Sequence, residues 1–215
     1  MMNPPERSPE RDAAIEALLA QDGACGWTMA ALRAALRDSA AHGDASLAEE
    51  DADLLFPGGV TDLIEAFVDL NDRRMAEAVA AADLSALRLS ARVREVIAIR
   101  LRVLRPNREA VRRAIAILAL PPNAPLAGRC MARTVDAIWY AAGDTSADFS
   151  WYTKRGILTG VYTATLLFWL REPGEDDAAT LGFLDRRLAG VGRIGALRRR
   201  AEGALSCLRP GGTAA

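Results

Sequence analysis

The sequence predicts an all-α fold, made of an N-terminal helix-turn-helix module and a C-terminal helical bundle. Apolar residues recur every three or four positions along most of the chain from residue 10 to residue 188, which is the spacing of one face of an α-helix. Serine, threonine or asparagine precedes several of these stretches, and glycine or paired prolines follow them, as expected at helix ends. At 215 residues the chain is long enough to bury a sizeable core.

Three short helices are expected in the N-terminal part. They cover residues 10–21, residues 29–39 after a capping Thr28, and residues 47–56 after Ser46. This order, with a tight turn between the last two helices, is typical of a helix-turn-helix module, here residues 10–60. Residues 1–9 contain acids and prolines but no apolar run, so we expect a disordered tail on a cytoplasmic protein rather than a signal or transit peptide.

The expected helix-turn-helix module carries the wrong charge for DNA. A DNA-reading module needs arginine and lysine on and around its third helix, because neutralised phosphates supply most of the nonspecific affinity. No lysine or arginine lies between Asp38 and Asp72. The acidic residues of this window are Asp38, Asp44, Glu49, Glu50, Asp51, Asp53, Asp62, Glu65, Asp69 and Asp72. We therefore expect an acidic scaffold that does not bind DNA.

A second helical domain is expected over residues 61–185. Its helices are predicted at residues 62–82 after Thr61, 91–104 after Ser90, 108–120 after Asn107, 123–142, 156–170 and 178–188. Gly143 is suited to end the fourth of them. Arginines recur in and just after the helix at 91–104, namely Arg92, Arg94, Arg100, Arg102 and Arg105. We interpret them as a solvated cationic face, with an anion site as the alternative.

Residues 144–170 form the most distinctive stretch of the chain. The first half combines acids, aromatic residues and the adjacent cations Lys154 and Arg155, whereas residues 156–170 carry no charge. Asp148 or Ser150 is placed to cap the uncharged helix. That helix would span only ~22 Å, against ~30 Å for the core of a bilayer, so it is expected to be buried in protein.

A resemblance to a known family rests on this stretch. The run is Gly143-Asp144-x-Ser146-x-Asp148-Phe149-x-Trp151-Tyr152-Thr153-Lys154-Arg155, followed by Leu-x-x-Val-Tyr162-x-x-Thr165. It resembles the signature of the coenzyme Q (ubiquinone) biosynthesis lipid-binding protein family, and the expectation is an alphaproteobacterial member. The resemblance covers roughly residues 90–190 well and the helix-turn-helix region weakly. It implies a TetR-like fold, binding of isoprenoid lipids, and assistance to a demethoxyubiquinone hydroxylase without catalysis.

Two binding sites are predicted in the bundle. A lipid pocket like the effector pocket of TetR-type proteins is expected from apolar and aromatic residues, namely Ile138, Leu158, Tyr162, Leu166 and Phe168; an ordinary core is the alternative. A partner-binding surface is expected from aromatic residues beside cations, namely Trp139, Trp151, Tyr152, Lys154 and Arg155. The resemblance implies that Trp151 and Tyr152 engage the hydroxylase.

The chain changes character from Arg186 onward. Arginines alternate there with apolar residues at helical spacing, which predicts a basic amphipathic helix over residues 186–208 and a short tail over residues 209–215. Its membrane-contacting residues are expected to be Leu188, Arg193, Ile194, Leu197, Arg198, Arg199, Arg200 and Leu205. Docking on its own protein is the alternative.

Catalytic chemistry finds little support in the sequence. His42 is the only histidine, so nucleophilic triads and histidine-based metal sites lack partners, and no phosphate-binding glycine loop occurs. The three cysteines, Cys25, Cys130 and Cys207, are far apart and are expected to be small buried residues of a reducing cytosol. We expect no enzyme activity, cofactor or metal.

The predicted function is that of an accessory protein of ubiquinone biosynthesis. The expected homodimer binds a polyprenylated quinone intermediate, associates peripherally with the inner membrane and presents the lipid to the hydroxylase. The TetR-like fold that the resemblance implies pairs its last two long helices with those of a second copy. Two consecutive helices near the C-terminus carry apolar residues on more than one face and fit that role, so a homodimer is expected. The alternative is a TetR-type transcriptional regulator that senses an apolar ligand.

Overall fold

The computed structural model of the protein describes residues 4–21, 26–42, 47–144, 150–172, 174 and 177–190. Every regular element within these ranges is a helix, so the predicted all-α class is confirmed. The chain divides into two compact units, residues 1–155 and residues 156–215. The predicted domain limits at residues 60 and 185 remain a proposal.

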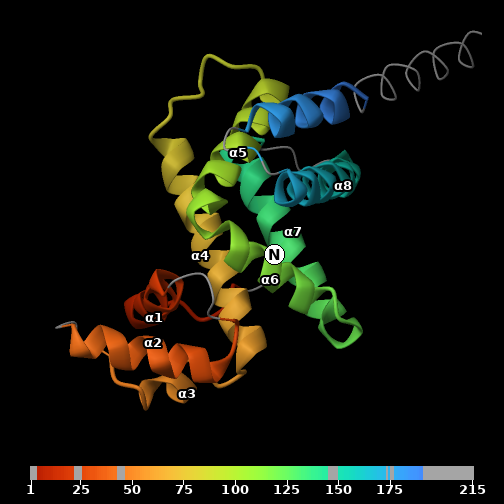
Figure 1. The fold of residues 1–215 in the computed structure, drawn as a ribbon. Helices are drawn as coiled ribbons and strands as arrows, with labels where there is room; N and C mark the ends of the chain where they lie inside the picture. Colours follow the sequence, from red (N-terminus) through yellow and green to blue (C-terminus); the bar gives the residue numbers. More distant parts are fainter. Residues whose placement is uncertain are drawn as a thin grey trace, which may run out of the picture. The chain divides into compact units, whose positions relative to one another are not determined.

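The first unit begins with three short helices, α1 (Pro9–Ala20), α2 (Met29–Ala41) and α3 (Asp51–Leu55) (Figure 1). Ser8 and Thr28 cap the first two, because their hydroxyl oxygens accept hydrogen bonds from the Arg11 and Ala31 amides at 3.1 and 3.0 Å. The capping role predicted for Thr28 is therefore confirmed. Apolar side chains of α1 and α2 fill the space between these helices, and Ile15, Leu32 and Leu36 are buried.

Two expectations for this module need correction. Residues 7–9 do not belong to a disordered tail: α1 begins at Pro9, and Arg7 forms two hydrogen bonds of 2.7 and 2.8 Å with the Asp69 carboxylate. The third helix begins at Asp51 rather than residue 47, because the Asp51 carboxylate accepts the Ala48 amide at 2.7 Å and holds the preceding residues in a turn. Ser46, its expected cap, lies outside the described residues.

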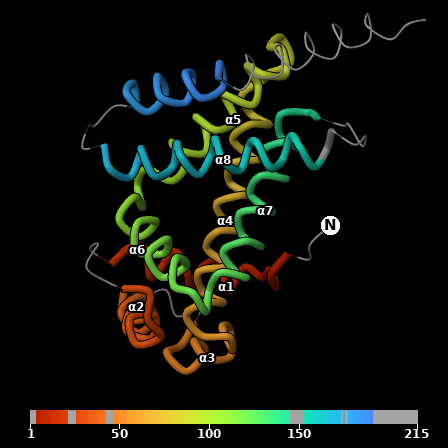
Figure 2. Tube along the Cα trace, turned by 90° about the vertical axis from the view of Figure 1, so that its right-hand side faces the viewer, coloured from red at the N-terminus to blue at the C-terminus, as the bar shows by residue number. Residues whose placement is uncertain are grey.

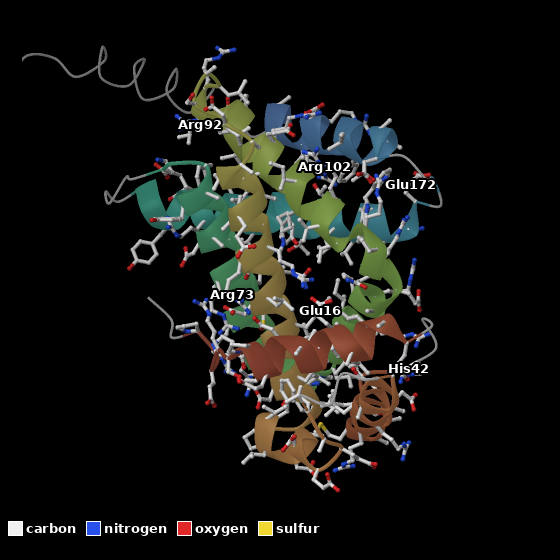
Figure 3. All side chains as sticks on the ribbon, turned by 90° about the vertical axis from the view of Figure 1, so that its left-hand side faces the viewer. Glu16, His42, Arg73, Arg92, Arg102 and Glu172 are labelled. Carbon is white, nitrogen blue, oxygen red and sulfur yellow. The ribbon has the colours of Figure 1, made fainter. Side chains whose placement is uncertain are left out.

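The long helix α4 (Val60–Ala80) is the centre of the first unit and packs against α1, α5 and α7. Its first turn follows Gly59, whose φ of 66° favours glycine. Thr61 lies inside the helix and its hydroxyl donates to the Gly58 carbonyl at 3.1 Å, so the capping role predicted for Thr61 is wrong. In Figure 3, Arg73 extends from α4 toward α1, where it pairs with Asp12 at 2.7 Å.

Three further helices complete the bundle of the first unit: α5 (Leu89–Leu104), α6 (Arg108–Leu118) and α7 (Ala124–Ala141). Short 3-10 turns, η1 (Arg105–Asn107) and η2 (Pro121–Asn123), precede α6 and α7. Figure 2 shows α4 and α7 running side by side, with extensive contact along their lengths. The predicted helices therefore exist, and their observed limits differ from the predicted ones by a few residues at most.

The helix α8 (Ser150–Arg171) runs across the boundary between the two units. It includes Trp151, Tyr152, Lys154 and Arg155, which were expected to precede the helix. Ser150 is the first helical residue rather than its cap, and Asp148 lies outside the described residues. No helix in the described ranges is long and apolar enough to cross a bilayer.

The second unit continues with a helix over residues 178–190. The Trp169 indole N–H donates to the Asp177 carboxylate at 3.3 Å, which connects the end of α8 to the start of that helix. Of the predicted basic helix 186–208, residues 186–190 are helical, and residues 191–215 lie outside the described part of the chain.

Candidate functional site

The end of α7 and the start of α8 carry an aromatic surface, by which we mean Trp139, Tyr140, Tyr152, Lys154 and Arg155. Tyr140 is 83 % exposed and Tyr152 is 75 % exposed, values that are unusual for aromatic side chains. The helical turn explains this at α7, because successive residues point about 100° apart: Ile138 is fully buried, Trp139 is half-buried and Tyr140 faces solvent. Two aromatic side chains of this surface are therefore largely exposed to solvent.

Ion pairs fix the start of α8 against α7 beneath the aromatic side chains. The Lys154 ammonium lies 3.5 Å from the Asp144 carboxylate and 5.9 Å from the centre of the Trp139 ring. The Arg155 guanidinium pairs with Asp136. Both predicted cations are thus engaged with residues of their own unit, which holds the aromatic surface in place.

A glycine closes α7 at the edge of the aromatic surface. Gly143 has a φ of 77°, its amide donates to the Tyr140 carbonyl at 2.9 Å, and the Asp144 amide donates to the Trp139 carbonyl at 3.1 Å. This pair of bonds is the Schellman arrangement of a helix C-terminus. The predicted role of Gly143 is therefore confirmed, and the turn places Asp144 where it pairs with Lys154.

The remaining partner-binding residue predicted from the sequence is Trp151. It lies in the first turn of α8, but its side chain is outside the described part of the structure. Tyr140 was not predicted as a site residue. The signal in the sequence was its position next to Trp139 on a helix whose buried face includes Thr134 and Ile138, which turns residue 140 outward.

The predicted lipid-binding residues fall in both units. Ile138 is fully buried in the first unit, and Leu158, Tyr162 and Leu166 are buried residues of the second. Phe168 stacks on Phe183 with ring centres 4.5 Å apart and lines an open groove of about 530 Å³ in the second unit. The other residues of this groove are Ala164, Leu167, Arg171, Glu172, Phe183 and Arg187. The lipid-binding assignment of these residues remains a proposal.

A buried polar network joins three helices of the first unit and was missed in the sequence. Arg100 of α5 lies 2.5 Å from Asp72 of α4, and the Thr134 hydroxyl of α7 lies 3.0 Å from the same carboxylate. Burial raises the pKa of Asp72, while Arg100 and Thr134 oppose that shift. Arg100 is therefore a core residue, and its assignment to a solvated face is wrong. Its spacing from Val93, Ile97 and Leu104 placed it on the apolar face.

The residues with catalytic potential do not form a site in the described ranges. His42 lies at the C-terminal end of α2 (Figure 3), where its Nδ1 is 2.7 Å from the Asp38 carbonyl oxygen. No cluster of histidine, cysteine, aspartate or glutamate in these ranges has the geometry of a metal site. Burial raises the pKa of the Cys130 thiol to about 11, so it is a poor nucleophile. Cys25 and Cys207 lie outside the described residues.

Comparison with known families identifies the segment that contains the aromatic surface. The sequence model of the COQ9 family matches residues 124–195. By COQ9 domain we mean residues 124–195, the stretch that this family model matches. This domain begins at the first residue of α7 and includes α8 and the helix over residues 178–190.

Relatives of the COQ9 domain occur in several eukaryotes. The chain is 39 % identical over 103 residues to the mitochondrial ubiquinone biosynthesis protein COQ9 of Rattus norvegicus, covering 48 % of this chain and 33 % of the rat protein. It is 33 % identical over 144 residues to the mitochondrial ubiquinone biosynthesis protein coq9 of Schizosaccharomyces pombe, covering 67 % of this chain and 57 % of that protein. The matched stretch thus spans about a third of the rat protein and little more than half of the yeast one.

The fold is similar to that of a bacterial regulator. The TetR transcriptional regulator from Nitrosomonas europaea superposes with a TM-score of 0.65 and 27 % identity, covering 85 % of this chain and 97 % of that one. The predicted TetR-like fold is therefore confirmed. The COQ9 domain thus belongs to a chain with a regulator-like architecture.

Proposed function

We propose that the protein is a non-catalytic, lipid-binding accessory protein of ubiquinone biosynthesis. The single observation that carries the proposal is the COQ9 domain over residues 124–195, together with relatives named as ubiquinone biosynthesis proteins. The domain contains α7 and α8, which supply most of the residues predicted for lipid and partner binding. The ligand is a polyprenylated quinone intermediate.

Lipid binding is supported by the apolar character of the second unit. Leu158, Tyr162 and Leu166 are buried aliphatic and aromatic residues of this unit, and the Phe168–Phe183 pair supplies a flat apolar wall to the open groove. An isoprenoid tail offers only aliphatic and olefinic surface, so it gains free energy mainly from apolar burial. Arg171 and Arg187 at the groove supply polar contacts for a headgroup.

Partner binding is supported by the aromatic surface. Tyr140 and Tyr152 expose large side chains on a framework fixed by the Lys154–Asp144 and Arg155–Asp136 pairs. Exposed tyrosine and tryptophan on a rigid support are typical of binding hot spots, because they add contact area at little cost in conformational entropy. The proposed partner is the demethoxyubiquinone hydroxylase.

The proposed assembly is a homodimer at the inner membrane. Ile157 and Leu167 are exposed apolar residues of α8, at 42 % and 47 %, and are available to pack against a second copy. The arginines of residues 186–208 are proposed to contact anionic headgroups from the cytoplasmic side, as a peripheral rather than a spanning association.

A calorimetric titration with the hydroxylase tests the proposed function. Trp151→Ala is expected to weaken binding by ~2 kcal/mol or more while helical content stays unchanged by circular dichroism. Leu54→Ala is the matched control, because Leu54 is 80 % exposed on α3, outside the COQ9 domain, and should leave the affinity unchanged. Equal affinities for the unaltered protein and Trp151→Ala would remove the partner-binding assignment.

The alternative function is a transcriptional regulator, which the likeness to the Nitrosomonas europaea protein favours. The charge of α3 opposes it. Arg33 of α2 pairs with Asp53 at 2.6 Å and Arg37 with Glu49 at 3.4 Å, so nearby arginines are engaged by acids rather than directed to phosphates. Gel retardation across a range of salt concentrations separates the two, and we expect no retardation of duplex DNA.

A further inference from the structure

The turn that joins α6 to α7 exposes a group of apolar residues within a segment that has no charged residue. Its exposed members are Ala119, Leu120, Pro121, Pro122, Ala124 and Pro125, and the exposed fraction of Leu120 is 53 %. No charged residue occurs from Ala114 to Gly128. In Figure 1 the turn stands out from the rest of the first unit. This apolar tip is distinct from the aromatic surface and from the basic segment after residue 186.

The backbone of the apolar tip has no unsatisfied N–H group. Three of the residues from 119 to 125 are prolines, which have no N–H. The amides of Ala119 and Leu120 donate to the carbonyls of residues 115 and 117 at 2.9 and 3.2 Å, and those of Asn123 and Ala124 donate to residues 120 and 121. The Asn123 side-chain amide donates to the Ile117 carbonyl at 2.8 Å. The tip can therefore leave water without leaving a backbone donor unpaired.

Cations flank the apolar tip on both sides. Arg105, Arg108, Arg112 and Arg113 precede the uncharged stretch, and Arg129 follows it. Glu109 is the one acid from residue 105 to residue 129, and both Arg112 and Arg113 bond to it, at 3.2 and 3.1 Å. Glu65 of α4 adds one further acid, because it pairs with Arg129 at 3.9 Å. The five arginines still outnumber the two acids, as expected for a surface that meets anionic headgroups.

We propose that residues 119–125 insert into the interfacial region of an anionic lipid bilayer. Leu120 and the prolines enter the boundary between headgroups and acyl chains, and Arg113 and Arg129 lie at the level of the phosphates. An exposed apolar tip whose backbone N–H groups are all paired, between flanking arginines, suits the boundary of an anionic bilayer. The inference does not depend on lipid presentation or on the segment after residue 186, because it uses different residues.

A tryptophan probe in the full chain tests the insertion directly. Leu120→Trp is compared with Leu54→Trp, which places the same probe at an exposed leucine of α3. Both are mixed with phosphatidylcholine vesicles that contain phosphatidylglycerol and brominated acyl chains, and the emission of the unaltered protein, with its four tryptophans, is subtracted. We expect a blue shift and bromine quenching for Leu120→Trp only. Quenching of Leu120→Trp no greater than that of Leu54→Trp would overturn the proposal.

A sedimentation assay supplies the second measurement. Leu120→Glu is expected to lower vesicle affinity about tenfold, because it places a carboxylate in the apolar boundary and beside anionic lipid. Leu54→Glu should leave vesicle affinity unchanged, and thermal melting checks that both variants are folded. Binding of Leu120→Glu equal to that of the unaltered protein, or no vesicle binding by the unaltered protein, would contradict the proposal.

Discussion

The Arg100 guanidinium lies 2.5 Å from the Asp72 carboxylate inside the helical bundle of the first unit, and the two side chains are only 4 % and 9 % exposed. Thr134 completes the contact from α7 with a hydroxyl 3.0 Å from the carboxylate. Three helices, α4, α5 and α7, are thus joined by one buried ion pair and one hydroxyl hydrogen bond. Since α7 also carries Trp139 and Tyr140, this network fixes the helix that supports the aromatic surface.

Removing one partner of this ion pair should destabilise the fold. Arg100→Met keeps the apolar length of the side chain but leaves the Asp72 carboxylate buried without its cation, at an expected cost of about 3–5 kcal/mol in the free energy of unfolding. Urea unfolding at pH 7 measures this cost. Arg102→Met is the matched control, because Arg102 is 57 % exposed on the same helix and should change stability by less than about 0.5 kcal/mol.

The deficit of Arg100→Met should depend on pH. Burial already raises the pKa of Asp72, and loss of Arg100 removes an interaction that opposes this shift, so the pKa rises further. A carboxyl whose pKa is higher in the folded state loses stability as pH rises through that pKa. The free energy of unfolding of the variant should therefore be close to that of the unaltered protein near pH 4, and the difference between them should be largest at pH 8. A pH-independent deficit would show that lost packing, not buried charge, is the cause.

Gly143→Ala should destabilise the turn that follows α7 at the edge of the aromatic surface. The left-handed backbone at φ 77° costs about 1–2 kcal/mol for an L-residue, and the added Cβ would lie 2.8 Å from the Arg92 Nη1 atom. Gly128→Ala is the control, because Gly128 lies inside α7 in open space and the change should stabilise the helix by about 0.5–1 kcal/mol. Opposite signs in thermal or urea unfolding are expected, and equal signs would contradict this account of the turn.

Tyr140→Ala and Tyr152→Ala should each weaken hydroxylase binding without changing stability. Their side chains are mostly exposed, so truncation removes contact area for the partner and little packing within the chain. We expect a loss of at least about 1 kcal/mol in binding for each, by calorimetry, with unfolding free energies within about 0.5 kcal/mol of the unaltered protein. Unchanged affinity in both variants would place the contact elsewhere on the domain.

Cys130 should resist alkylation in the folded protein. Its thiol is buried and its pKa of about 11 leaves very little thiolate at pH 7.5. Iodoacetamide treatment followed by peptide mass spectrometry should find Cys130 unmodified without denaturant and modified in urea. Rapid modification of Cys130 in the native protein would show that α7 opens in solution.

The helices of the first unit could be predicted from sequence because their signals are local. Apolar spacing, the Thr28 cap and the Gly143 terminator depend on neighbours within one or two turns. Thr61 misled the prediction because a threonine inside the first turn can donate backward to a carbonyl that precedes the helix, instead of capping the helix. The shortened α3 has a similar cause in the Asp51 side chain.

The buried network and the exposure of the aromatic surface could not be predicted, because both depend on contacts between residues far apart in the sequence. Asp72 and Arg100 are 28 positions apart, and only their contact in the folded chain explains why a charged pair interrupts two apolar faces. Aromatic and charged residues marked the surface in the sequence, but their types did not show which of them form contacts within the chain and which are exposed. Lys154 pairs with Asp144 just after α7 and Arg155 pairs with Asp136 in α7, whereas Tyr140 and Tyr152 face solvent.

Native mass spectrometry of the purified protein, followed by organic extraction, tests the central claim of lipid binding most directly. The proposed function predicts a folded protein with added mass, and an isoprenoid or quinone in the extract. A protein of unliganded mass that stays so when ubiquinone precursors are supplied would contradict the claim. The COQ9 domain would then have an interaction role without a lipid cargo.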